Sequence, residues 1–145
     1  MSKGNTFEND LMLLLFNNTN AANIGDATGL RGSSTAGSLY ASLHTGDPGE
    51  TGDQTTSECA YTLYARVAVA RSGAGWTVTA NSVSPAANVD FPAASGGSET
   101  ATHFAIGTAS SGAGKILYKG TISPNISISS GVQPRLSTAT TITED

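Results

Sequence analysis

The densest run of apolar side chains lies near the N-terminus and follows a helical pattern. Apolar positions three and four residues apart predict an amphipathic α-helix over residues 6–17. One stripe of this helix consists of Phe7, Leu11, Leu14 and Leu15. Three further apolar residues, Met12, Leu13 and Phe16, extend the apolar surface most of the way round. Such a helix has to be buried, either against the sheet of its own domain or against a neighbouring subunit.

The ends of this helix carry recognisable signals. Asn5 or Thr6 is expected to cap its start, because a short polar side chain accepts a hydrogen bond from the first turn. Two acidic residues, Glu8 and Asp10, favour the positive N-terminal end of the helix dipole. Asn17 and Asn18 are expected to stop the helix.

Residues 17–38 show no sustained hydrophobic period and are rich in Asn, Ala, Gly, Ser and Thr. This composition predicts a long loop or arm, and long structureless loops in compact domains usually have a function or are disordered. We therefore expect residues 1–38 to be an assembly element held by a neighbouring molecule. The partner-binding residues expected in it are Phe7, Leu11, Leu14, Leu15, Ile24, Leu30 and Arg31.

After residue 38 the pattern changes to short segments of β type separated by turns. The predicted strands cover residues 38–44, 61–71, 75–80, 88–91, 101–107, 115–123, 125–129 and 135–143. No helical pattern separates them, which disfavours a parallel α/β sheet. The predicted fold is mainly β: a jelly-roll-like or β-sandwich single domain over residues 39–145, preceded by an N-terminal helix and extended arm.

Alternation is clearest on either side of a glycine-containing turn at residues 72–75. Leu63, Val67 and Val69 share one face of the first segment, and Trp76 begins the second. This spacing predicts a hairpin over residues 61–80 whose inner face lies in the β core.

Charge and composition narrow the possible partners. The chain has 145 residues, a formal net charge of -4 and only 12% charged side chains, against about a quarter in a typical soluble domain. Its seven Lys and Arg residues are scattered, so we expect no nucleic-acid partner. The apolar run 11–16 is too short to span a bilayer and lacks a preceding basic segment, so we expect neither a membrane helix nor a signal peptide.

Few residues suggest catalysis or metal binding. His44 and His103 are the only histidines, and no Gly-x-Ser-x-Gly motif accompanies them. We interpret both as hydrogen-bonded residues at a sheet edge or turn. The single cysteine, Cys59, has no intrachain disulfide partner and no zinc-like spacing, which favours an unreactive apolar role. We therefore expect no enzyme, and no catalytic, cofactor-binding or metal-binding residues.

Two polar loops have competing interpretations. Residues 46–53 contain Asp47, Glu50 and Asp53, whose carboxylates suit calcium. The Asp-Pro-Gly sequence in this loop equally suits a tight turn, which we favour. The glycine-rich residues 109–116 lack the first glycine and the final Ser or Thr of a phosphate-binding loop. We interpret them as a hairpin turn.

Several blocks of sequence resemble a family of small virion structural proteins of tailed bacteriophages. In order, these blocks are SLHTGDPGE (42–50), TTSE (55–58), YTLYARVAV (61–69), FPAA (91–94), THFAIG (102–107), GAGKILY (112–118) and GVQPR (131–135). The resemblance covers about residues 38–143. The family commonly has Gly between Thr and Tyr where this chain has Leu63.

This resemblance implies a non-enzymatic virion protein, because members are labelled tail-fibre proteins or look like head decoration (cement) proteins. We predict a capsid decoration protein on the head surface that binds the major capsid protein and stabilises the head. The alternative is a tail- or fibre-associated receptor-binding protein. The sequence has no heptad stalk and no triple-helical repeat, which favours cement. We also expect contacts with other virion proteins, a homo-oligomer, synthesis in the host cytoplasm and no cofactor.

Overall fold

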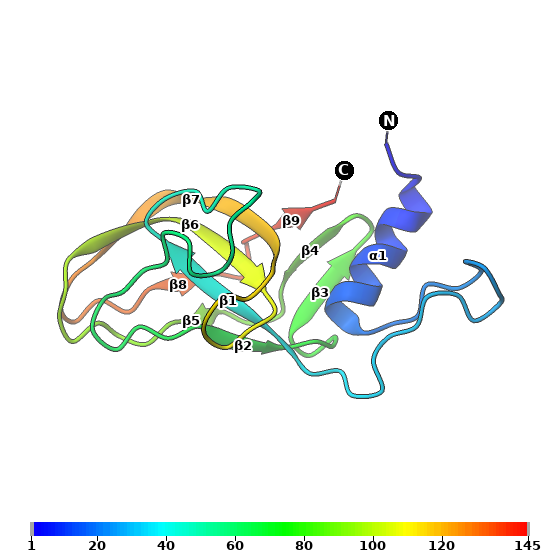
Figure 1. Cartoon of the computed structure of the whole chain (residues 1–145), viewed down its shortest axis with the longest axis horizontal. Coiled ribbons are helices and arrows are strands. Elements are labelled where there is room, and N and C mark those ends of the chain that lie inside the picture. The colour runs from blue at the N-terminus through cyan, green and yellow to red at the C-terminus, as the bar shows by residue number, and fades with distance from the viewer. Residues whose placement is uncertain (1, 145) are drawn as a thin grey trace. The chain divides into compact units, whose positions relative to one another are not determined.

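The structure is a computed structural model that describes residues 2–144. Its elements in chain order are α1 (Asn5–Asn17), β1 (Ser38–His44), β2 (Val67–Ala70), β3 (Trp76–Thr79), β4 (Ser82–Pro85), β5 (Val89–Asp90), β6 (Glu99–Gly107), β7 (Ile116–Ile128), β8 (Arg135–Leu136) and β9 (Ile142–Thr143). All of the strand pairs whose registers are defined run antiparallel. The predicted class, mainly β with one N-terminal helix, is confirmed (Figure 1).

The chain forms two compact units. The first, here called the helical unit, combines Met1–Ser38, Val69–Asn88 and Ser137–Asp145. The second, the sheet unit, combines Leu39–Ala68 and Val89–Leu136. The chain first passes between the units after Ser38, and the N-terminal helix and arm share their unit with strands from the middle and the end of the chain.

In the helical unit, α1 packs against a three-stranded sheet of order β3-β4-β9. The side chains of Met12 and Phe16 are fully buried there. The ring of Phe16 meets that of Trp76 edge-on, with centroids 4.9 Å apart, a favoured aromatic geometry. Figure 1 shows α1 lying beside β3 and β4. The helix was predicted to be buried against its own domain's sheet or against a neighbouring subunit. The face that carries Met12 and Phe16 is covered by the sheet.

The buried face of α1 differs from the predicted stripe. Glu8, Met12 and Phe16 are buried, whereas Phe7 is 39% exposed and the three predicted leucines of the stripe are half-buried. Because the helix is apolar most of the way round, spacing alone does not select the face. The buried ring of Trp76 provides the surface against which Phe16 packs.

The helix ends also differ in part from prediction. The N-cap is Gly4, and no side chain caps it, so the predicted capping role of Asn5 or Thr6 is wrong. At the other end Asn18 adopts φ 57° and its N–H bonds to the Leu13 carbonyl, the expected left-handed termination. Arg71 donates hydrogen bonds to the carbonyls of Leu14 (2.6 Å) and Leu15 (2.7 Å).

The sheet unit contains most of the large buried residues. β1, β6 and β7 are neighbours in a four-stranded sheet of order β2-β1-β6-β7, and β5 pairs with β8. The β1 bounds equal the prediction, and the two strands predicted over residues 115–129 are the single strand β7. The buried apolar residues of this unit are Leu39, Ala41, Leu43, Cys59, Tyr61, Val89, Phe91, Ala94, Ala101, Phe104, Ala105, Ile106, Ile128 and Leu136.

The predicted hairpin over residues 61–80 is wrong. Only Val67–Ala70 of its first segment is a strand, and β3 pairs with β4, a strand that the sequence analysis missed. Trp76 is fully buried as predicted, but Leu63 is 62% exposed. The chain turns at Leu63, which has φ 79°, and this turn interrupts the alternation on which the prediction rested.

Candidate interaction surface

The arm that follows α1 folds back on itself. The Asn18 side chain bonds to Ser33 in both directions, accepting from its N–H (2.6 Å) and donating to its carbonyl (2.9 Å). Further out, Ala21 and Leu30 exchange two backbone hydrogen bonds of 2.9 Å. At the tip, the Asp26 carboxylate accepts hydrogen bonds from the backbone around Thr28. A hydrogen bond from the Thr28 hydroxyl, together with these backbone bonds, lowers the pKa of Asp26. The arm is therefore a hairpin-like loop whose two sides are joined by hydrogen bonds within the loop.

Large apolar side chains are exposed on this unit. Among residues 2–144, the exposed large apolar side chains are Phe7 (39%), Ile24 (38%), Leu30 (43%) and Leu63 (62%). The first three belong to the predicted partner-binding set, and all three lie in the helical unit. Arg31, also in that set, is exposed beside Leu30 and donates to the Thr28 hydroxyl (2.8 Å).

These predicted residues do not form one patch. Phe7 lies in the first turns of α1, while Ile24 and Leu30 lie on the arm that follows the last turn. A helix of this length extends about 20 Å. The helical unit therefore presents two separate apolar regions, one at each end of α1 (Figure 1).

A feature that the sequence analysis missed lies next to the first region. The buried Glu8 side chain, 7% exposed, lines a pocket of about 130 Å³ together with Asn5, Ala80 and Asn81. A signal for its burial was present in the sequence, because Glu8 precedes Met12 and Phe16 at four-residue spacing. The helix-dipole role predicted for Glu8 does not include this burial.

The two histidines lie in central strands. His44 in β1 pairs with His103 in β6, and each of these strands has a neighbour on both sides. Their predicted place at a sheet edge or turn is therefore wrong, although the predicted hydrogen bonding is present. Both segments are rich in apolar residues that pack within the sheet, which the sequence analysis underweighted.

His44 and Ser42 form a fully buried pair. The Ser42 Oγ lies 2.9 Å from His44 Nε2, and His44 Nδ1 lies 2.8 Å from the Thr56 carbonyl. This accounts for both ring nitrogens. Burial lowers the pKa of His44. Although a Ser–His contact is typical of an activated nucleophile, both side chains are 0% exposed, so a substrate has no access to them.

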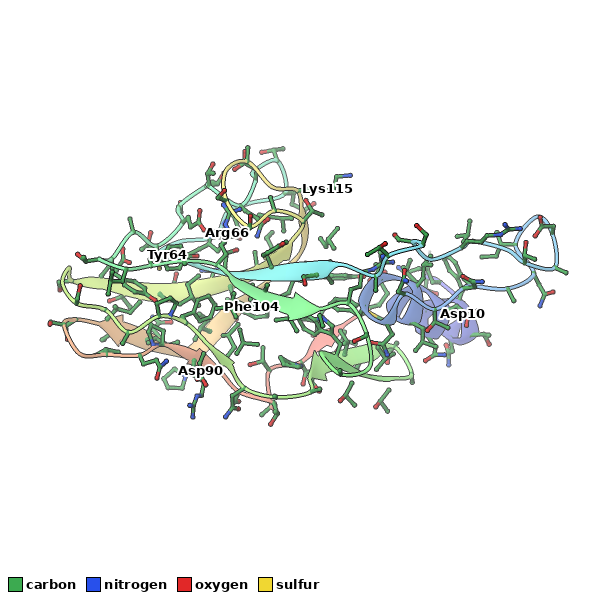
Figure 2. The ribbon with its side chains drawn as sticks, turned by 90° about the horizontal axis from the view of Figure 1, so that it is seen from below. Asp10, Tyr64, Arg66, Asp90, Phe104 and Lys115 are labelled. Atoms are coloured by element: carbon green, nitrogen blue, oxygen red, sulfur yellow. The ribbon has the colours of Figure 1, made fainter. Side chains whose placement is uncertain are left out.

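An ion pair anchors the glycine-rich turn between β6 and β7. The Arg66 guanidinium binds Glu58 through two nitrogens (2.7 and 2.8 Å) and also donates to the carbonyls of Ala109 (3.0 Å) and Gly112 (2.8 Å). The hydrogen bond to Glu58 raises the pKa of Arg66. Figure 2 shows Arg66 beside this turn. The predicted hairpin turn at residues 109–116 is confirmed.

The acidic loop is held as a set of turns. Asp47 accepts a hydrogen bond from the Gly49 N–H (2.9 Å) and pairs with Lys119 (2.9 Å). Asp53 accepts from the N–H of Thr55 (2.7 Å). Within residues 2–144 no group of three or more His, Cys, Asp or Glu side chains is arranged to hold a metal. These bonds agree with the turn interpretation that we favoured.

The remaining candidates are also accounted for. Cys59 is 2% exposed, and burial raises its pKa to about 12, consistent with the predicted apolar role. In the part of the chain that the structure describes, no helix is both long and apolar enough to cross a bilayer.

Antiparallel sheets, a self-bonded arm and exposed apolar side chains on the helical unit define a small β-rich protein suited to contacts with other proteins. The model of the family described as Podophage GP4 fiber I protein gp80 matches residues 4–143, and the chain belongs to this family. It is therefore a virion structural protein of the tailed-phage type, as the resemblance implied, and the match includes the helix and the arm. A comparison with curated protein sequences found no match.

Proposed function

We propose that this chain is a non-enzymatic component of the phage fibre that attaches to neighbouring virion proteins through the helical unit. The supporting observation is that Phe7, Ile24 and Leu30, three of the four exposed large apolar side chains among residues 2–144, lie on this unit. Exposed apolar groups of this size gain free energy when a partner covers them, at roughly 25 cal/mol per Å².

The fibre is favoured over the head because the family is described as a fibre protein. Our sequence-based prediction of capsid cement placed many copies on the head surface, bound to the major capsid protein. A fibre protein instead has few copies per particle and contacts fibre and tail proteins. Counting copies per particle by quantitative mass spectrometry separates the two: a number comparable to that of the major capsid protein supports cement, and a number tens of times smaller supports the fibre.

The non-enzymatic part of the proposal is supported by the polar side chains that could otherwise take part in catalysis, because they bond to one another within the fold. The Ser42–His44 contact is buried, and Glu58 is bound by Arg66. These groups contribute to folding instead of facing a substrate.

Attachment is best tested on the arm by point substitution. Deleting residues 1–38 removes the buried side chains of Met12 and Phe16, and with them the ring contact of Phe16 with Trp76, so it tests folding as well as attachment. The double substitution Ile24→Ser and Leu30→Ser removes only exposed apolar groups. The matched control is Leu63→Ser, which removes an exposed leucine from the sheet unit.

Purified variants are added to phage particles that lack this protein, and the bound fraction is measured after sedimentation. We expect the arm variant to bind at least about tenfold more weakly, the effect of losing roughly 1.4 kcal/mol of contact free energy. The Leu63→Ser control should bind like the wild type. Equal binding by the arm variant contradicts attachment through the arm.

A further inference from the structure

The strand β7 lies at one edge of the four-stranded sheet. The order of this sheet is β2-β1-β6-β7, so β7 has β6 as a neighbour on one side only. With 13 residues, β7 is the longest strand in the described part of the chain. The outer edge of a strand carries main-chain donors and acceptors that a further strand can use.

Hydrogen bonds in the neighbouring strands identify which β7 residues face β6. The N–H of Leu43 in β1 donates to the Tyr64 hydroxyl (3.0 Å), and the Leu43 carbonyl accepts from the Cys59 N–H (2.8 Å). Both main-chain groups of Leu43 therefore point away from β6. The residue opposite Leu43 on β6 is Phe104, so the alternation of an antiparallel ladder directs the Phe104 main chain to its β7 partner, Gly120.

The residues on either side of Gly120 consequently face outward. Successive residues of an antiparallel strand bond to alternate sides, so Lys119 and Thr121 direct their N–H and carbonyl groups to the outer edge. Among residues 2–144, no hydrogen bond to these main-chain groups is present. An edge lysine ordinarily discourages strand addition by its charge, but the Lys119 ammonium is held by Asp47 (2.9 Å). This part of the edge is open to a further strand.

A groove follows the same part of the edge. Its volume is about 320 Å³, and it is lined by residues 116–119 on one side and by Gly49, Glu50 and Gly52 on the other. Because consecutive side chains of a strand point to opposite faces, four consecutive residues line one groove only where it runs along the strand edge. The two glycines in the opposite wall have no side chain to fill it. The groove therefore fits an extended segment that adds as a strand.

The charges of the groove and of β7 are complementary. The loop of residues 46–53 contains Asp47, Glu50 and Asp53 and no basic residue, whereas residues 115–128 contain Lys115 and Lys119 and no acidic residue. Glu50 and Lys115 (Figure 2) are exposed, and in the described part of the chain neither has an ion-pair partner. A strand with the sequence of β7 suits this groove in charge as well as in shape.

We propose that β7 of one copy of this protein adds antiparallel to β7 of a second copy along this groove. Each copy presents the same edge, so one two-fold axis pairs both edges at once. Two four-stranded sheets are then joined edge to edge. The inference goes beyond the proposed function, because β7 belongs to the sheet unit and attachment to other virion proteins was assigned to the helical unit.

Amide hydrogen exchange, followed by NMR on the full-length wild-type chain, tests this pairing. At low protein concentration the N–H groups of Lys119 and Thr121 should exchange fast, as solvated edge amides do. Once most chains are paired, both should exchange at least about tenfold more slowly. The Gly120 N–H, which faces β6, should be protected at both concentrations and is the internal control. Sedimentation velocity over the same concentration series measures the fraction of dimer.

Substitutions separate the main-chain contribution from the charges. Thr121→Pro removes an outward N–H, and proline is tolerated at such edge positions. It should weaken the dimer at least about tenfold, because each copy loses a hydrogen bond. The matched control Thr121→Ala keeps the N–H and should associate like the wild type. Glu50→Lys should weaken association at low ionic strength and do so less at high ionic strength.

The inference is overturned if the wild-type chain is monomeric at every concentration, or if it forms trimers or larger rings, since an edge that pairs with itself closes at two copies. Association without protection of the Lys119 and Thr121 amides also overturns it. So does undiminished association of Glu50→Lys at low salt, or of Thr121→Pro when circular dichroism shows that it folds. If Thr121→Pro does not fold, the exchange pattern of the wild type decides. Attachment through Ile24 and Leu30 is measured on other variants, so neither result determines the other.

Discussion

Leu63 occupies a backbone conformation that favours glycine. Its φ is 79°, and the Tyr64 N–H bonds to the Tyr61 carbonyl (2.9 Å), so Leu63 is the third residue of a four-residue turn. A positive φ at this position is typical of a type II turn, where glycine is preferred. A side chain with a Cβ costs about 1–2 kcal/mol in left-handed backbone.

Replacing Leu63 by Gly and by Ala separates the backbone from the side chain. Both variants lose the same leucine contacts, which are modest because the side chain is 62% exposed. Glycine removes the left-handed strain of about 1–2 kcal/mol but adds about 0.4–1 kcal/mol of entropy to the unfolded chain. We therefore expect Leu63→Gly to be more stable than Leu63→Ala by about 1 kcal/mol.

Urea unfolding at equal protein concentration measures this difference through the midpoint. Ala65→Gly is the matched control, because Ala65 lies two residues away and is also exposed, but does not have positive φ. At position 65 we expect the usual effect of glycine, so the Ala65→Gly variant should be less stable than the wild type by about 0.4–1 kcal/mol. If Leu63→Gly proved equal to or less stable than Leu63→Ala, the assignment of strain to Leu63 would be refuted.

Two further predictions concern the buried residues. Trp76→Ala should lower the free energy of unfolding by about 3–5 kcal/mol, since Trp76 is fully buried against Phe16. A loss below about 1 kcal/mol, measured by urea unfolding, contradicts its place in the core of the helical unit. His44 should make folding sensitive to acid. Burial lowers the pKa of His44 below 6.5 in the folded chain, so protonation favours the unfolded chain, and stability present above pH 6.5 is lost as the pH falls below it. In His44→Gln, the slope of unfolding free energy against pH should be smaller between pH 6.5 and 5; an unchanged slope shows that another group is responsible.

Several features followed from local pattern. The dense apolar spacing predicted a helix whose C-terminal end agrees with the structure, and residues 38–44 form β1 as predicted. The glycine-rich stretch at 109–116 predicted the turn between β6 and β7. These features depend on residues close together in the chain, so hydrophobic period and turn chemistry are sufficient to find them.

Pairing and packing did not follow from pattern. Ser82–Pro85 has too few apolar residues to be recognised as a strand, yet it pairs with β3 and β9. The segment predicted as one strand over 135–143 is two short strands, because a turn between Ser137 and Thr140 divides it. Partner choice depends on residues far apart in the chain, and local alternation contains no information about them.

The sequence by itself determined the kind of protein: its mainly β class, its one apolar helix and the family resemblance. The tertiary structure alone decided which face of α1 is buried, because a helix that is apolar most of the way round has no preferred side until Trp76 provides one. The same packing turned Glu8 inward at the spacing of Met12 and Phe16. An acidic side chain near a helix start is ordinarily solvated, and only the neighbouring β3–β4 turn makes it a pocket.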